Sequence, residues 1–224
     1  MILEKLIHKS GLLEKNIKPP SQSFVYASVS YLFAFPVFRI LFRGKSIGIS
    51  NVPKTGGVVV VSNHGSHLDP PILGHALRRP VAFMAKAELF KIPILSSVIS
   101  ACGAYPVSRG AGDREAIRTA SNRLNQGWAT GVFLDGTRQD NGRVNDPKAG
   151  AALLSARTGC PILPVAIVNS HRAFPKGSRF LQLVPIHLRV GQLIKPPLTK
   201  KRESLLATTD EIQSVINSML DKGL

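Results

Sequence analysis

Acidic residues are scarce in this sequence: 13 Asp and Glu stand against 29 Lys and Arg, which leaves a formal net charge of +16. Such an excess predicts an anionic partner, either nucleic acid, a phosphorylated substrate or an acidic membrane surface. Nucleic acid is disfavoured, because the sequence has no zinc-ligand spacing, no helix-turn-helix pattern and no RNA-binding aromatic motif. The charge therefore favours a phosphate-bearing substrate or a membrane.

Cysteine is also rare, since Cys102 and Cys160 are the only two in 224 residues. Two cysteines are too few for a disulfide framework, and their spacing is not typical of a metal site. A hydrophobic content of 44% and a mean hydropathy of +0.09 are high for a soluble protein but low for a polytopic membrane protein. We expect a reduced, cytosol-facing location and a chain long enough for one sizeable core.

Aromatic residues are concentrated near the start, where residues 24–42 hold seven of the thirteen Phe and Tyr residues. Nineteen residues are barely enough to cross a bilayer, and the stretch is interrupted by Ser28, Ser30, Pro36 and Arg39. A cleaved signal peptide is not expected, because mixed charges and "KPPSQS" precede the stretch. We interpret residues 1–45 as an N-terminal membrane-associated helical region whose aromatic helix lies in the membrane interface. A core helix is the alternative.

Beyond a linker, strand and helix patterns alternate through residues 46–224, which we take as the main domain. Buried strands are predicted at 58–62, 81–85, 104–107, 130–134, 162–168 and within 181–190. Helices are predicted at 70–77, 113–127, 148–157 and 203–220, the first with Asp69 as its N-cap. This alternation predicts an α/β fold, with a mixed, largely parallel sheet flanked by helices.

A polar cluster, "NHGSHLD", follows the valine strand at 58–62 and precedes a helix. If the turn folds back, Asp69 can accept the imidazole Nδ1–H of His64 and leave Nε2 as an outward-facing base. Two alternatives remain open. In the first, Asp69 is only a helix cap and His64 is a loop residue. In the second, His64, His67 and Asp69 bind a metal, which would need further ligands that nothing nearby supplies.

Two further strand ends carry residues suited to an anionic substrate. "GAYPVSRG" ends in Arg109, and "GVFLDGTRQD" ends in Asp135, Gly136, Thr137 and Arg138. The carboxyl ends of parallel strands gather at one edge of a sheet. Arginine suits phosphate because its planar fork makes two parallel hydrogen bonds. These arginines are therefore candidates for binding phosphate near His64.

Four ordered motifs resemble those of the glycerolipid acyltransferases typified by bacterial lysophosphatidic acid acyltransferases. Asn63, His64 and Asp69 match the first, residues 103–109 the second, "FLDGTR" the third and the proline-flanked 161–164 the fourth. The third departs from the usual Phe-Pro-Glu-Gly-Thr-Arg, since Leu134 replaces proline and Asp135 replaces glutamate. The resemblance spans roughly residues 45–195.

The resemblance implies transfer of a fatty acyl group from an acyl thioester to the hydroxyl of lysophosphatidic acid, forming phosphatidic acid. His64 would be the base and Asp69 its partner, while Lys86, Arg109 and Arg138 would bind the phosphate. Backbone N–H groups around Gly136 would stabilise the oxyanion. The donor would be acyl-CoA or acyl carrier protein, with no cofactor and no metal, on the cytoplasmic face of a membrane. The alternatives are another lysolipid acceptor, or a non-catalytic basic protein that binds membranes or nucleic acid.

Overall fold

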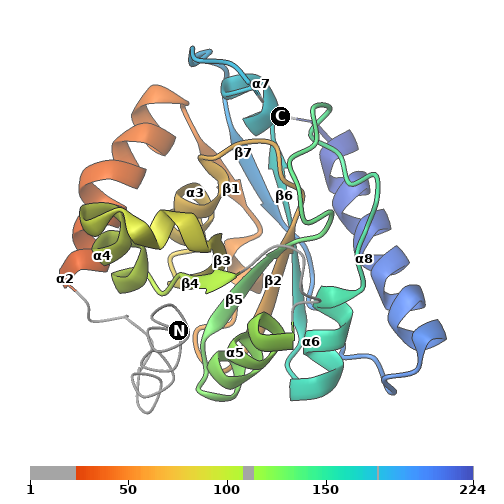
Figure 1. Ribbon diagram of the computed structural model, residues 1–224. Coiled ribbons are helices and arrows are strands. Elements are labelled where there is room, and N and C mark those ends of the chain that lie inside the picture. The colour runs from red at the N-terminus through yellow and green to blue at the C-terminus, as the bar shows by residue number, and fades with distance from the viewer. Residues whose placement is uncertain (1–23, 108–113, 176, 224) are drawn as a thin grey trace.

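Seven strands form one sheet in the computed structural model, which describes residues 24–107, 114–175 and 177–223 (Figure 1). The strand order is β1-β7-β6-β2-β5-β3-β4, and every pair is parallel except β6 with β7. The predicted α/β fold with a mixed, largely parallel sheet is confirmed. The strands are β1 (Lys45–Ile47), β2 (Val58–Ser62), β3 (Val81–Lys86), β4 (Tyr105–Val107), β5 (Ala129–Phe133), β6 (Ile162–Val168) and β7 (His187–Val190).

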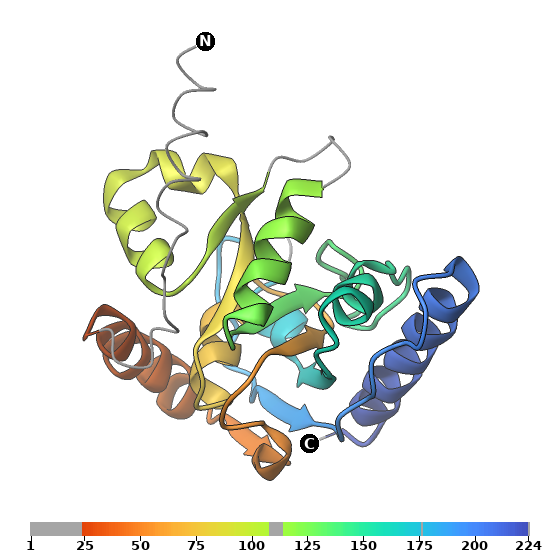
Figure 2. The ribbon, with the colours of Figure 1, turned by 90° about the horizontal axis from the view of Figure 1, so that it is seen from below.

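Helices cover both faces of the sheet, as the view from below shows (Figure 2). One face is covered by α3 (Asp69–Ala76) and by the helical segment α2 (Phe24–Ser28), η2 (Val29–Ala34) and η3 (Pro36–Leu41). The other face is covered by α5 (Arg114–Asn125), α6 (Gly150–Thr158) and α8 (Arg202–Asp221). The shorter elements are η4 (Ile49–Asn51), η5 (Ala87–Lys91), α4 (Pro93–Ala101) and α7 (Ser170–Ala173).

Strand β2 lies between β6 and β5 in the sheet, which explains why it begins with four valines. Its side chains alternate between the two faces, so Val58 and Val60 join one hydrophobic cluster while Val59 and Val61 join the other. A strand buried on both faces needs apolar residues at every position. The polar cluster can begin only where β2 leaves the sheet, after Ser62.

The aromatic N-terminal segment packs on the sheet through one side only. Phe38 and Phe42 are fully buried and share a cluster with Ile72 and Leu73 of α3. The Tyr26 hydroxyl also donates a hydrogen bond of 3.0 Å to the carbonyl of Gly74. The other side exposes large apolar side chains, so the segment combines a core helix with an apolar surface. None of the helices in the described ranges is both long and apolar enough to span a bilayer.

Two local predictions need correction, and a third is narrowed. The helix predicted at 70–77 begins one residue earlier, so Leu68 is its N-cap and Asp69 lies inside the first turn. The strand predicted within 181–190 is His187–Val190, and the N–H of Ile186 just before it donates to the carbonyl of Phe42. The linker after residue 45 contains β1, which extends the edge of the sheet.

Candidate active site

His64 and Asp69 form a hydrogen-bonded pair at the carboxyl end of β2. The Nδ1 atom of His64 lies 2.8 Å from Oδ2 of Asp69. The same oxygen accepts the backbone N–H groups of Gly65 and Ser66, each at 2.8 Å, so it acts as the acceptor in all three bonds. Nδ1 therefore carries the hydrogen of the neutral imidazole, and Nε2 carries the lone pair that can accept a proton. This is the base-and-partner geometry expected from the sequence.

Burial of the pair is strongly asymmetric, which suits a base and its orienting carboxylate. The Asp69 side chain is fully buried, whereas 16% of the His64 side chain is exposed. Three hydrogen bonds to Oδ2 offset part of the loss of water around Asp69, whereas its Oδ1 is buried without a hydrogen-bond partner among the described residues. Of this pair, only the imidazole is accessible to a ligand.

The face of His64 is covered by an aromatic ring that the sequence analysis gave no role. Phe133, the last residue of β5, stacks on the imidazole with ring centroids 3.8 Å apart and planes 11° from parallel. Behind it, Phe83 of β3 stacks on Phe133 at 5.4 Å. Phe133 is the first residue of the third motif, but the strand order is needed to show that it lies beside His64 of the first motif.

A second histidine that the sequence analysis missed, His171, packs over the turn. A Cβ added to Gly65 would lie 2.7 Å from the Cβ of His171, so only glycine fits between His64 and Ser66. His171 lies in α7, just after β6, and partial burial lowers its pKa. The signal available in the sequence was its position beyond a buried strand, the same rule that singled out His64.

Asn63 and Asp135 hold the backbone around the site. Asn63 is fully buried and donates from Nδ2 to the carbonyls of Gly142 (2.7 Å) and Ile167 (2.9 Å). Asp135 accepts the N–H groups of Asn145 (3.1 Å) and Asp146 (2.7 Å). Burial raises the pKa of Asp135, and these two N–H groups partly offset that effect. Both side chains thus support loop 139–146.

Loop 139–146 connects the His64 turn to the C-terminal helix. The N–H of Gln139 donates to the carbonyl of His64 at 2.8 Å. At the other end of the loop, Asn217 of α8 accepts the N–H of Val144 (3.1 Å) and donates to its carbonyl (3.0 Å). Arg143 pairs with Asp221, also on α8. The position of His64 therefore depends on contacts from three parts of the chain.

Two of the predicted cations lie near this edge. Lys86 ends β3 and is exposed, and Arg138 follows β5 and is half-buried. Partial burial lowers the pKa of His67, and its neighbours Arg138, His64 and Lys86, in that order, lower it further. His67 is thus within electrostatic reach of all three. Neither Lys86 nor Arg138 forms an ion pair with a carboxylate among the residues that the structure describes.

Arg109, Gly136 and Thr137 complete the predicted set. Arg109 lies outside the described residues, which omit 108–113. Gly136 adopts a left-handed conformation with φ of 66°, and its N–H donates to the carbonyl of Phe133 at 2.9 Å. That N–H closes a turn in this conformation, and the oxyanion role of the backbone N–H groups around Gly136 stays a prediction. Thr137 is exposed beside it.

Among the described residues, no three His, Cys, Asp or Glu side chains are grouped to hold a metal.

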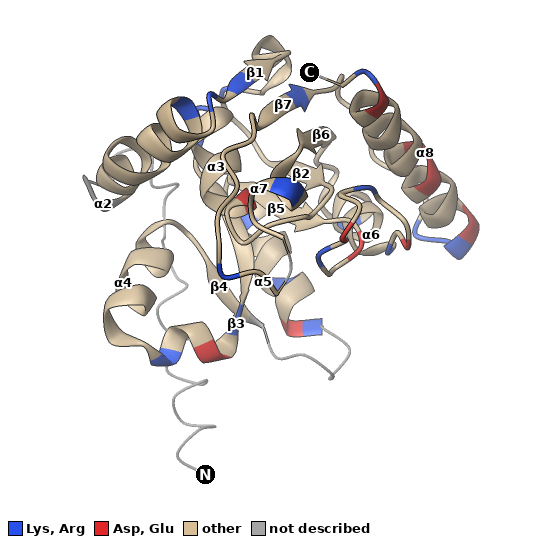
Figure 3. Cartoon of the chain, turned by 90° about the horizontal axis from the view of Figure 1, so that it is seen from above, with Lys and Arg blue, Asp and Glu red and all other residues tan. Residues whose placement is uncertain are grey.

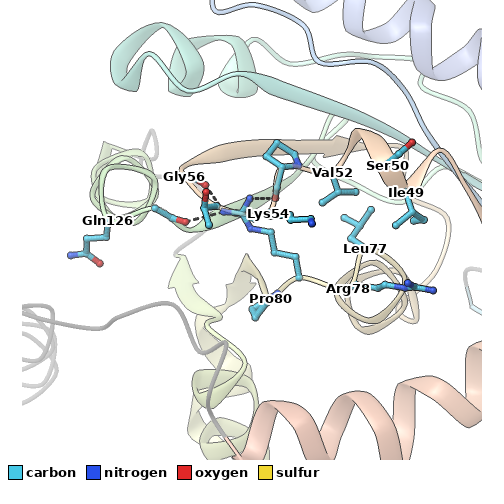
Figure 4. Close-up of a pocket in the computed structure, with 14 residues that line it drawn as sticks. Ile49, Ser50, Val52, Lys54, Gly56, Leu77, Arg78, Pro80 and Gln126 are labelled. Carbon is cyan, nitrogen blue, oxygen red and sulfur yellow. Dashed lines mark hydrogen bonds between the residues drawn. The ribbon is translucent and has the colours of Figure 1, made fainter.

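A hollow of about 630 Å³ lies at the opposite edge of the sheet (Figure 4). Its lining includes Gly56, Pro80 and Gly127, which lie one or two residues before the amino ends of β2, β3 and β5. Arg79 closes it by donating to the carbonyls of Pro53, Gly56 and Gly127. Since His64 follows the carboxyl end of β2, this hollow is separate from the candidate active site.

Comparison with known proteins gives a consistent result. A 1-acyl-sn-glycerol-3-phosphate acyltransferase of Borreliella burgdorferi is 29% identical over 66% of this chain and 60% of its own length. The chloroplastic LPAT1 of Arabidopsis thaliana, with the same enzyme name, is 28% identical over 88% of this chain and 52% of its own length. The chain thus spans about half to three fifths of these curated relatives.

The crystal structure of PlsC from Thermotoga maritima, a 1-acyl-sn-glycerophosphate acyltransferase, superposes with a TM-score of 0.74 at 26% identity. The match covers 88% of this chain and 79% of that one. The acyltransferase family model matches residues 24–168, which include the aromatic segment, the His64 turn and the third motif. The resemblance inferred from four motifs is confirmed: the chain belongs to the acyltransferase family.

Proposed function

We propose that this protein transfers a fatty acyl group from an acyl thioester to the free hydroxyl of lysophosphatidic acid, which yields phosphatidic acid. The observation that carries the proposal is the His64–Asp69 pair, with Nδ1 held at 2.8 Å and Nε2 free at the edge of the sheet. The names of the relatives support the same reaction. The two serines of this turn, Ser62 and Ser66, are buried and hydrogen-bonded to backbone groups, so direct attack by the acceptor suits the geometry better than attack by either serine.

His64 supplies the acid–base chemistry in this proposal. Nε2 takes the proton of the acceptor hydroxyl as its oxygen attacks the thioester carbonyl. Asp69 keeps the hydrogen on Nδ1 and stabilises the imidazolium that forms. When the C–S bond breaks, the departing thiolate takes the proton back from Nε2, and a new ester remains. The base is regenerated, and neither a covalent acyl-enzyme nor a metal is needed.

Lys86 and Arg138 are proposed to bind the phosphate of the acceptor, together with Arg109 from the second motif. Support for Lys86 and Arg138 comes from their shared electrostatic reach to His67 on the His64 turn. A phosphate held there would place the glycerol hydroxyl near Nε2, so binding would also orient the reacting group. The thiol carrier is coenzyme A or acyl carrier protein. An acyltransferase for a different lysolipid is the alternative, which a panel of acceptors distinguishes.

Membrane attachment is proposed through an exposed apolar face on α2–η3 and the neighbouring η5–α4. On the first helical segment the exposed apolar side chains are Tyr31, Leu32, Phe33, Phe35, Ile40 and Leu41. On the second they are Leu89, Ile92 and Ile94. The two segments lie side by side, since α2 contacts α4 (Figure 1). This extent of exposed apolar surface is typical of an interaction site.

Charge supports a membrane at the same side of the molecule. Acidic residues gather around α8 and the loop before α6, the helices from α2 to η3 carry none, and η5 carries Glu88 together with Lys91 (Figure 3). Arg39, Arg43 and Lys45 end that segment. Basic residues beside an apolar face suit anionic lipid headgroups. We therefore propose that the protein acts at the cytoplasmic surface of a membrane.

The experiment that tests the reaction uses the purified full chain with lysophosphatidic acid and a labelled acyl-CoA, and in parallel with labelled acyl carrier protein. The wild type should form phosphatidic acid. His64→Ala should reduce turnover by roughly 10²–10⁴-fold, the usual contribution of a positioned acid–base group. A panel that replaces the phosphate monoester with other headgroups identifies the acceptor. Near-normal turnover by His64→Ala would reject the mechanism.

A further inference from the structure

We propose that Phe133 is a positioning residue for His64, and that Phe83 and Gly131 are required to hold it in place. The inference rests on the proposed function, because it concerns the base of that reaction. It goes further by assigning a role to an aromatic stack that neither the motifs nor the relatives' names describe. The stack consists of His64, Phe133 and Phe83.

The three rings come from three separate places in the chain. His64 is on the turn after β2, Phe133 is the last residue of β5 and Phe83 is in β3. Strand β5 lies between β2 and β3 in the sheet, so the order of the rings follows the order of the strands. The His64–Phe133 planes differ by 11° and the Phe83–Phe133 planes by 17°. Three nearly parallel rings therefore run across the end of the sheet.

Gly131 shows that the strands make room for this stack. It pairs directly with Phe83 across β3 and β5. A Cβ at position 131 would lie 2.1 Å from Cε1 of Phe83, so any other residue would displace the ring. Glycine inside a strand weakens the strand, and it is typical of places where another group approaches closely. Here the approaching group is the ring that supports Phe133.

The stack restrains a motion that the Asp69 hydrogen bond leaves open. That bond fixes the distance of Nδ1 from one oxygen, but the imidazole plane can still tilt about it. A parallel ring at 3.8 Å blocks tilting toward Phe133. The direction of Nε2 is set by the plane of the ring. Because proton transfer depends on the alignment of donor and acceptor, holding this plane should raise kcat more than it affects binding.

The test compares Phe133→Leu with Phe133→Tyr in the full chain, using lysophosphatidic acid and acyl-CoA. Leucine keeps an apolar side chain but removes the flat surface, so kcat should fall on the order of ten- to a hundred-fold, with the KM of both substrates little changed. Tyrosine keeps the ring and should retain most of the wild-type kcat. Gly131→Ala, which displaces Phe83, should reduce kcat in the same direction.

Two controls separate positioning from general damage. Phe42→Leu removes a fully buried ring from the same hydrophobic cluster, and should lower the urea midpoint of unfolding without a comparable loss of kcat. In a His64→Ala background, Phe133→Leu should cause no further loss, because its effect acts through the imidazole. An unchanged kcat in Phe133→Leu and Gly131→Ala, while His64→Ala is inactive, would overturn this inference and leave the proposed function intact. An active His64→Ala would instead reject the proposed function.

Discussion

The side chain of Asn63 and the backbone of Ile167 form a reciprocal pair of hydrogen bonds between the ends of β2 and β6. Nδ2 of Asn63 donates to the carbonyl of Ile167 at 2.9 Å, and the N–H of Ile167 donates to Oδ1 at 2.8 Å. The amide thus continues the backbone pairing past the point where β2 leaves the sheet. The asparagine of the first motif therefore holds the turn that carries His64.

Replacing Asn63 with Ala should destabilise the protein and also lower its activity. The change leaves the N–H and carbonyl of Ile167 and the carbonyl of Gly142 without the Asn63 side chain as their partner, at about 1–3 kcal/mol for each unsatisfied group. We expect a loss of about 2–4 kcal/mol in the free energy of unfolding, measured by urea denaturation. Asn122→Ala, at an exposed position of α5, is the matched control and should change the free energy by less than about 0.5 kcal/mol.

Replacing Arg138 with Ala should weaken use of a phosphorylated acceptor. One charge-assisted hydrogen bond contributes about 1.5–3 kcal/mol, so kcat/KM should fall on the order of ten- to a hundred-fold. Arg138→Lys should restore little, because a point charge cannot reproduce the planar fork. Lys86→Ala should have a smaller effect, since this side chain is exposed. The measurement is initial rate against lysophosphatidic acid concentration.

The same variant gives a sharper comparison with an acceptor that lacks the phosphate. Removing that phosphate should reduce the wild-type rate far more than the rate of Arg138→Ala, because the variant has already lost the contact. If both proteins lose the same factor, Arg138 does not contact the phosphate. Exposed Arg118 on α5 provides a charge-matched control, and Arg118→Ala should respond to the phosphate as the wild type does.

Charged substitutions on the apolar face should release the protein from vesicles. Leu32 and Ile94 are 79% and 82% exposed, so Leu32→Asp with Ile94→Asp should leave the fold intact. Sedimentation with vesicles of anionic phospholipid should show much weaker binding of the double variant. High salt should weaken wild-type binding only partly, because it screens the charges and leaves the apolar contribution. Leu198→Asp is the control, since Leu198 is 99% exposed and precedes α8. Equal losses in both proteins would reject the proposed face.

Stability should fall below neutral pH through His75, which packs α3 against the N-terminal segment. Its Nδ1 lies 2.9 Å from the Ser30 hydroxyl, and its ring contacts Tyr31, Phe35 and Phe38. Burial lowers the pKa of His75, and the positive charges of Arg39 and Arg78 lower it further. The folded state thus disfavours the imidazolium.

The sign of the effect follows from proton binding. As pH falls through about 6.5, the ordinary pKa of histidine, His75 binds a proton in the unfolded chain but stays neutral in the folded protein, where its pKa is lower. The free energy of unfolding should therefore decrease from pH 7.5 to about pH 5.5, and His75→Gln should flatten that decrease. The measurement is urea unfolding at both pH values. Parallel curves for wild type and His75→Gln would show that other groups cause the pH dependence.

Local patterns predicted much of this molecule, because they depend on neighbours in the chain. The valine run of 58–62, the apolar 162–168 and the helix-forming pattern of 113–127 all lie in the expected elements. The His64–Asp69 contact was also predictable, since a separation of five residues across a tight turn leaves few other arrangements. The third motif was identified as well, but the contact of its first residue, Phe133, with the His64 ring was not.

By itself, then, the sequence determined most of the strands and the longer helices of the main domain, and which turn carries His64 and Asp69. Burial of alternating apolar residues and the reach of a five-residue turn are local properties. The tertiary structure decided which residues from distant segments meet: Phe133 on His64, Phe83 against Gly131, and Asn217 on the loop beyond Asp135. It also decided that the aromatic segment presents Phe38 to the core and Leu32 to the outside. These outcomes depend on strand order and on how helices dock across the sheet, which are set by packing of the whole chain rather than by any one stretch of it.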